Sequence, residues 1–95
     1  MTSKNKKINR LLIQLMEECA EIQQASSKAL RFGLRDTHHD TTPEQCIATE
    51  LDDLRVVVMK LMAKGLDLRP SRKRQKVKWK KLAAMDRYSD KHGRI

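Results

Sequence analysis

The sequence predicts an all-α protein. Two stretches carry apolar residues at spacings of three and four, which places those residues on one side of a helix, and helix-capping signals bound both stretches. Aromatic residues make up only 3% of the chain, so its core is expected to consist of aliphatic side chains and Met. The chain has 95 residues, so we expect one domain spanning 1–95. We expect this domain to be a helical bundle that is only marginally stable alone and is completed by oligomerisation.

The first helix is expected over about residues 6–32. Gly33 follows the last periodic residue and is suited to the position just after a helix. The predicted apolar stripe comprises Ile8, Leu11, Leu12, Leu15, Cys19, Ile22, Ser26 and Ala29.

Residues 34–42 lack an apolar period and are expected to form a loop. Thr42 and Gln45 then match a capping box, with Pro43 at the first helical position, so a second helix is expected over about 43–64 and ends before Gly65. Its predicted stripe comprises Ile47, Leu51, Leu54, Val58, Leu61 and Met62.

A third helix is expected over about 71–90, within a basic C-terminal segment, residues 69–95. Its apolar residues scatter around the helix, so no packing face can be predicted. Residues 1–64 hold 10 Lys/Arg against 9 Asp/Glu, whereas residues 65–95 hold 11 against 3. The positive charge of the chain is therefore concentrated near its C-terminus.

Carboxylates gather in the middle of the first helix, with no basic residue nearer than Arg10 and Lys28. At 100° per residue, Glu18 falls at the edge of the predicted stripe, and Glu21 and Glu17 lie progressively further from it. The three acids are expected to form a band that begins at the core and leads outward.

The second helix repeats this arrangement in the sequence ELDDL. Glu50 falls inside the apolar arc and Asp53 at its edge, whereas Asp52 should face water. Most helical acids are solvated surface residues, which suits Asp52 and Glu44. An unpaired charge in an apolar arc is costly, however, and acids converging from two helices repel one another. A divalent cation such as Mg²⁺ or Mn²⁺ would relieve both problems.

These residues resemble a known family. Glu17-Glu18-Cys19-Ala20-Glu21 followed by Glu50-Leu51-Asp52-Asp53 is similar to the EExxE…ExxD motif of the MazG-like, all-α nucleoside triphosphate pyrophosphohydrolases. The segments EECAEI and SKALRFG look most like small stand-alone members, including phage-encoded ones. The resemblance covers roughly residues 11–62.

The resemblance implies cleavage of an NTP or dNTP between its α- and β-phosphates, giving NMP and pyrophosphate. It implies that Mg²⁺, with Mn²⁺ as a substitute, is bound by Glu18, Glu21, Glu50 and Asp53. It places Glu17 beside them, as a further ligand or as the residue that positions the attacking water. It also implies a dimer or tetramer. The loop between the motif halves is long for the family, and its His38 and His39 are expected to be solvated and not ligands.

The basic C-terminal segment is open to three interpretations. Lys78 and Lys81 resemble the family's basic positions and could bind substrate phosphates; the lysines and arginines around Trp79 could bind nucleic acid; or the segment is a solvated helix face. A pure nucleic-acid-binding module would leave the motif acids unexplained. A catalytically silent interaction protein is the remaining alternative.

Location is predicted from what the sequence lacks. The basic N-terminus MTSKNKK is not followed by an apolar signal core, and no apolar run approaches the ~20 residues of a membrane span. Cys19 and Cys46 lack CxxC spacing. A reduced cytoplasmic protein is expected, in the host cytoplasm if it is phage-encoded, with no membrane partner.

Overall fold

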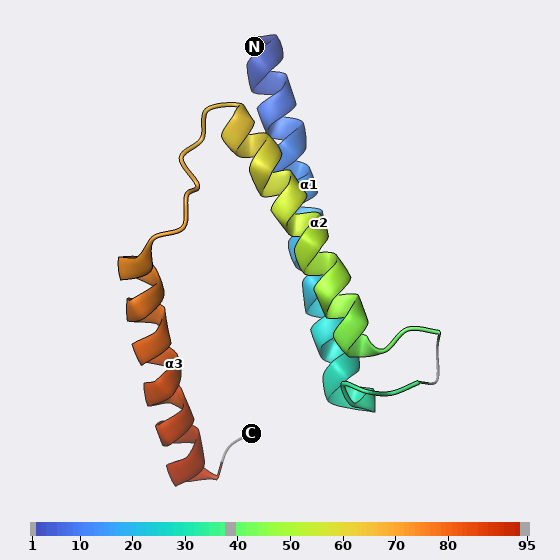
Figure 1. Ribbon diagram of the computed structural model, residues 1–95, viewed down its shortest axis with the longest axis vertical. Coiled ribbons are helices and arrows are strands. Elements are labelled where there is room, and N and C mark those ends of the chain that lie inside the picture. The colour runs from blue at the N-terminus through green and yellow to red at the C-terminus, as the bar shows by residue number, and fades with distance from the viewer. Residues whose placement is uncertain (1, 38–39, 94–95) are drawn as a thin grey trace.

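The computed structural model describes residues 2–37 and 40–93, and these form three helices with no strand among them. Helix α1 spans Ser3–Phe32, α2 spans Pro43–Ala63 and α3 spans Arg72–His92 (Figure 1). The all-α prediction is confirmed. None of the three helices combines the length and apolar character that crossing a membrane would need. His38 and His39 lie outside the described residues.

The helix ends follow from their caps. The Thr2 side chain accepts a hydrogen bond from the Asn5 amide, so α1 begins at Ser3 and not near residue 6. The apolar period starts only at Ile8, which is why the polar first turn escaped prediction. Gly33 has a φ of 93° and its N–H donates to the Ala29 carbonyl, as expected for the residue after a helix.

The predicted capping box of α2 is confirmed. The Gln45 amide donates to Thr42 Oγ1 at 3.1 Å, and the Thr42 amide donates to Gln45 Oε1 at 2.9 Å. At the other end of α2, Gly65 adopts a φ of 102° and donates to the Met62 carbonyl. The end of α2 is therefore within one residue of the prediction.

Helices α1 and α2 run antiparallel and pack against each other along their length (Figure 1). Leu11, Val57 and Leu61 form the buried cluster, and Ile8, Leu15 and Leu66 pack against it. Ala25 and Pro43 are buried nearer the connecting loop. We call this α1–α2 unit the hairpin, with an open end, where α1 begins and α2 ends, and a loop end.

The buried face of α1 agrees with the predicted stripe at Leu11, which is buried, and at Ile8, Leu15, Ile22 and Ala29, which are half-buried. Cys19 and Ser26 are exposed, whereas Ala25 is buried. These three positions differ from the prediction because packing against α2, and not hydropathy alone, determines which side of α1 is covered. On α2, Val57 is buried although the predicted stripe contained Val58 instead.

Helix α3 packs against neither α1 nor α2 in the described structure, and none of its residues is buried (Figure 1). The radius of gyration is consequently 17.2 Å, compared with about 12 Å for a compact domain of this length.

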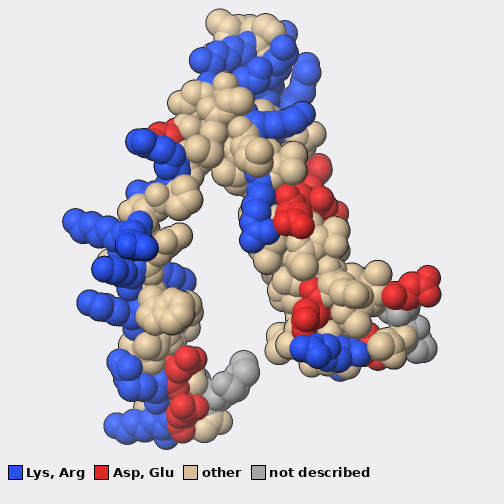
Figure 2. All heavy atoms as spheres, viewed as in Figure 1, with Lys and Arg blue, Asp and Glu red and all other residues tan. Residues whose placement is uncertain are grey.

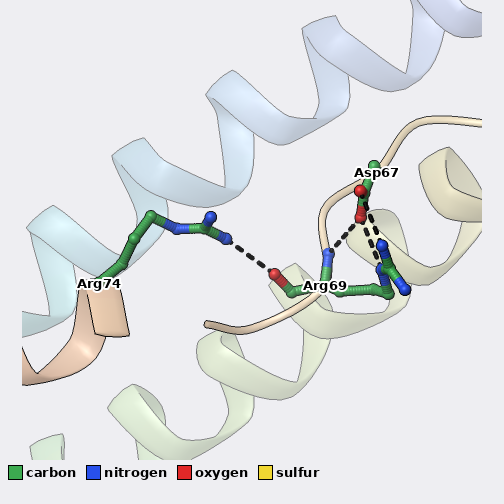
Figure 3. Close-up of polar contacts among 3 residues, drawn as sticks. All are labelled: Asp67, Arg69 and Arg74. Atoms are coloured by element: carbon green, nitrogen blue, oxygen red, sulfur yellow. Dashed lines mark hydrogen bonds and ion pairs between the residues drawn. The ribbon is translucent and has the colours of Figure 1, made fainter. Parts of the chain in front are cut away.

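The connection to α3 is held by polar contacts (Figure 3). The Arg69 guanidinium donates to both carboxylate oxygens of Asp67, at 2.9 and 3.1 Å. Arg74, in the first turn of α3, donates to the Arg69 carbonyl at 2.9 Å, and Ser71 caps the helix. Leu66, earlier in the same connection, packs against the buried cluster of the hairpin. The turn into α3 is therefore held by apolar packing at its start and by polar contacts at its end.

Candidate metal centre

Three carboxylates meet in the middle of the hairpin. Glu18 of α1 and Glu50 and Asp53 of α2 each contribute one oxygen, and these oxygens lie within 4.8 Å of one another. Glu18 and Glu50 are half-buried and Asp53 is exposed. We call this group the acid cluster. Figure 2 shows acidic side chains gathered at mid-hairpin, between a basic open end and the loop end.

Two members of the acid cluster, Glu18 and Glu50, lie where α1 and α2 pack together. On α1, Leu15 precedes Glu18 by three residues and Ile22 follows it by four, so Glu18 continues the row of residues that face α2. On α2, Glu50 stands in the same relation to Ile47 and Leu54. Glu18 is half-buried, which agrees with the expectation that it lies at the edge of the core.

The environment opposes ionisation of these acids. Burial raises the pKa of Glu18 above its usual 4.5, and the charges of Asp53 and Glu50 raise it further, with smaller contributions from Glu21 and Glu17. Burial also raises the pKa of Glu50, and the charges of Glu21 and Asp53 add to this effect. Within the described residues, no Lys or Arg forms an ion pair with the acid cluster.

Glu21 and Glu17 lie outside the group of three. Glu21 is exposed, one turn beyond Glu18, yet its charge acts on both Glu18 and Glu50. Glu17 is also exposed and its charge acts on Glu18. The structure thus brings three of the predicted metal ligands together and sets the fourth predicted ligand, Glu21, beside them.

Asp52 and Asp53 are separated as the sequence predicted. Asp52 faces solvent, with a side chain 75% exposed, and its carboxylate accepts from Arg55 at 2.7 Å. Asp53, the next residue, belongs to the acid cluster. Glu44, the other acid expected at the surface, pairs with Arg35 at 2.8 Å.

The donor set suits a hard divalent cation. Carboxylate oxygens are the preferred ligands of Mg²⁺, and opposite oxygens of its shell lie about 4 Å apart, close to the spread of the acid cluster. A cation would also supply the counter-charge that nearby residues do not. Glu18, Glu50 and Asp53 would hold it, and the charge of Glu21 acts on both Glu18 and Glu50.

Lys78 and Lys81 are not brought to the acid cluster. Both are exposed on α3, which makes no contact with the hairpin in the single chain. Their role as phosphate ligands stays a prediction.

Two hollows flank the acid cluster along the hairpin. The open-end hollow, about 410 Å³, is bordered by Lys7 and Arg10 of α1 and Lys60 and Lys64 of α2. The loop-end hollow, about 280 Å³, lies beside Phe32. Sequence reasoning overlooked both, although Lys7 and Arg10 are spaced to share a helix face and an antiparallel partner would place the end of α2 beside them.

Comparison of the chain with models of known protein families, with curated proteins and with solved structures gave no match.

Proposed function

We propose that this protein is a divalent-cation-dependent nucleoside triphosphate pyrophosphohydrolase of the MazG-like type, as its motif resemblance implies. The observation that carries the proposal is the position of the acid cluster. Glu18 and Glu50 are half-buried where α1 and α2 pack, and among the described residues no Lys or Arg forms an ion pair with them. Acids that weaken the fold in this way are best explained by a function that requires them.

The reaction is hydrolysis of a phosphoanhydride. Water and a nucleoside triphosphate give a nucleoside monophosphate and pyrophosphate: the water oxygen forms a new bond to phosphorus, and the bond to the oxygen that bridges the α- and β-phosphates breaks. When bound, Mg²⁺ neutralises phosphate charge and lowers the pKa of water. Glu18, Glu50 and Asp53 would hold the cation, with Glu21 as a fourth ligand. Glu17 would orient the attacking water and accept its proton.

The direct test is incubation with a panel of NTPs and dNTPs in Mg²⁺, with separate assays for pyrophosphate and orthophosphate. We expect pyrophosphate and NMP, abolished by EDTA and restored by Mg²⁺ or Mn²⁺. Release of orthophosphate and NDP, or a rate indifferent to EDTA, would refute the proposed reaction.

A second candidate function is nucleic-acid binding by α3. The observation in its favour is a row of basic residues on a helix that packs against nothing in the described chain. Trp79 is 78% exposed among them and could stack on a base. This candidate leaves the acid cluster without a role, so it ranks second. Retention of single-stranded DNA by wild type, with a steep salt dependence that is lost when Lys76, Lys80 and Trp79 are replaced, would support it.

A further inference from the structure

Helix α1 carries a second row of residues beside the row that packs against α2. Its members follow one another at alternating separations of four and three, which keeps them on one side of the helix, about 90° around from the packed row. All of them are exposed and none is charged. They are Leu12, Met16, Cys19, Gln23, Ser26 and Leu30.

Helix α2 extends this side of the hairpin. Arg10 and Lys60 border the open-end hollow and so mark one flank of the hairpin. The second row of α1 lies on the other flank, and so do the half-buried α2 residues Ile47, Leu51, Val58 and Met62. The charged residues at this edge of α2 are already paired: Glu44 lies 2.8 Å from Arg35, and Arg55 2.7 Å from Asp52. We call the second row and these four α2 residues the apolar flank.

The chain exposes more surface than a compact monomer does. Its solvent-accessible surface is 8404 Å², whereas a compact monomer of 11.1 kDa exposes about 5,700 Å². The excess of about 2,700 Å² includes side chains of the apolar flank, since Met16 is 71% and Leu30 83% exposed. A standard protein–protein contact covers about 800 Å² of each partner. The uncovered surface is therefore more than a stable dimer needs.

Helix α3 is an unsuitable cover for the apolar flank. At about 100° per residue, no sector of α3 wider than about 80° is free of Lys, Arg and Asp. Packing α3 there would remove water from charges that gain no partner on an uncharged surface. A second copy of the chain presents the same uncharged row, so both copies can cover it and keep their charges in water.

We propose that the apolar flank binds a second copy of this chain, with the two α1 helices antiparallel across a two-fold axis. The second row is self-complementary about a point midway between Cys19 and Gln23. An axis at that point places Leu12 of one copy opposite Leu30 of the other.

The same axis places Met16 opposite Ser26 of the other copy, so that a large side chain meets a small one, as close packing requires. The Ser26 hydroxyl already donates to the Ile22 carbonyl of its own helix at 2.9 Å, so covering it leaves no donor unpaired. Glu17 and Glu21 fall on the other side of α1 and stay open to solvent. The contact therefore does not depend on the proposed reaction and does not obstruct its site.

Adjacent glutamines provide a matched test. Gln23→Glu places a charge in the contact of each copy, close to its counterpart across the axis, and should raise the dissociation constant of the dimer about tenfold or more. Gln24→Glu makes the same change at the next residue, about 100° away and outside the second row, and should leave that constant unchanged. Both side chains are exposed in the single chain. Sedimentation equilibrium of the two variants and wild type is the measurement.

Cross-linking tests the register. In a Cys19→Ser/Cys46→Ser background, the double variant Leu12→Cys/Leu30→Cys should form a covalent dimer on oxidation. Either change alone should not, because antiparallel packing separates the two copies of each position by 18 residues, about 27 Å.

Three results would overturn the proposal. The first is a wild type that stays monomeric at micromolar concentration. The second is a dimer that Gln23→Glu and Gln24→Glu affect alike, or one that Trp79→Lys dissociates and Gln23→Glu does not, which would place the contact on α3. The third is cross-linking by the single variants Leu12→Cys and Leu30→Cys, which would show parallel packing. Pyrophosphate release enters none of these measurements, so failure of the proposed function would leave their interpretation unchanged.

Discussion

Glu18 and Glu50 meet across the α1–α2 seam, each in a position that its own helix gives to residues facing the other helix, with carboxylate oxygens within 4.8 Å. Two half-buried acids this close together destabilise the hairpin when both are ionised, because burial and repulsion oppose their charges.

Replacing Glu50 with Gln should abolish pyrophosphate release yet leave the metal-free protein as stable as wild type or more so. The change removes a charge from the seam and keeps the side-chain volume. Excess Mg²⁺ should raise the melting temperature of wild type, since a ligand at a hundred times its Kd adds about 2.7 kcal/mol, and should affect Glu50→Gln much less. The measurement is thermal melting of both proteins in EDTA and in Mg²⁺. Glu50 would be an ordinary structural residue if the metal-free variant melted at a lower temperature than wild type and if Mg²⁺ did not change the melting temperature of wild type.

The adjacent aspartates offer a matched pair. Asp53→Asn should abolish metal-dependent turnover, because Asp53 belongs to the acid cluster. Asp52→Asn should be nearly silent, costing about 0–1 kcal/mol of stability at most, because Asp52 only pairs with Arg55 at the surface. Steady-state pyrophosphate release by both variants is the measurement, and equal losses would place the catalytic face elsewhere on α2.

The pH dependence of stability has a definite sign. Folding raises the pKa of Glu18 and Glu50 above 4.5, so the folded chain holds more protons than the unfolded chain between pH 4.5 and the raised values. The free energy of unfolding contributed by these groups therefore falls as pH rises through that window, and the penalty is complete above it.

Other groups titrate nearby. Asp67, whose pKa is lowered chiefly by its hydrogen bonds from Arg69, stabilises the fold above pH 3.8 and loses this contribution as pH falls through its folded pKa. Urea unfolding of metal-free wild type and Glu50→Gln from pH 4 to 8 isolates the pair by difference. As pH falls, the free energy of unfolding of wild type should rise relative to that of Glu50→Gln. If the difference between the two proteins did not change with pH, the acids would not destabilise the fold in the way we propose.

We also predict a dimer or tetramer. Helix α3 exposes Val77, Trp79, Leu82, Met85 and Tyr88, each to at least 47%, and nothing in the described chain covers them. Exposed apolar surface of this extent favours association. Light scattering at micromolar concentration should give a mass at least twice that of the chain; a monomer would contradict the prediction.

The sequence predicted what depends on local rules. The Thr42–Gln45 capping box and the glycines at 33 and 65 rest on backbone chemistry within a few residues, and all are found as expected. It also predicted most of the buried face of α1, but it included Cys19 and Ser26, which are exposed, and omitted Ala25, which is buried. Those positions depend on how α2 packs against α1, which no pattern within α1 determines.

The candidate site was predictable to the same extent. The motif indicated Glu18, Glu50 and Asp53, because the spacing of each acid from the apolar residues of its own helix places it near the face that meets the other helix. The cations at the open end were overlooked because Lys7 and Lys60 are distant in sequence and meet only once α1 and α2 are paired antiparallel. The position of α3 could not be predicted either, since its apolar residues define no single face.

The acid cluster also lies between two groups of buried residues: Leu11, Val57 and Leu61 toward the open end, and Ala25 and Pro43 toward the loop end. Because burial and repulsion oppose the charges of Glu18 and Glu50, we expect the two halves of the metal-free hairpin to open separately. Amide hydrogen exchange should then report two protection levels along α1 in the metal-free protein. A cation held by Glu18 and Glu50 would join the halves into one cooperative unit, so loading the site would slow exchange far beyond the residues that touch it.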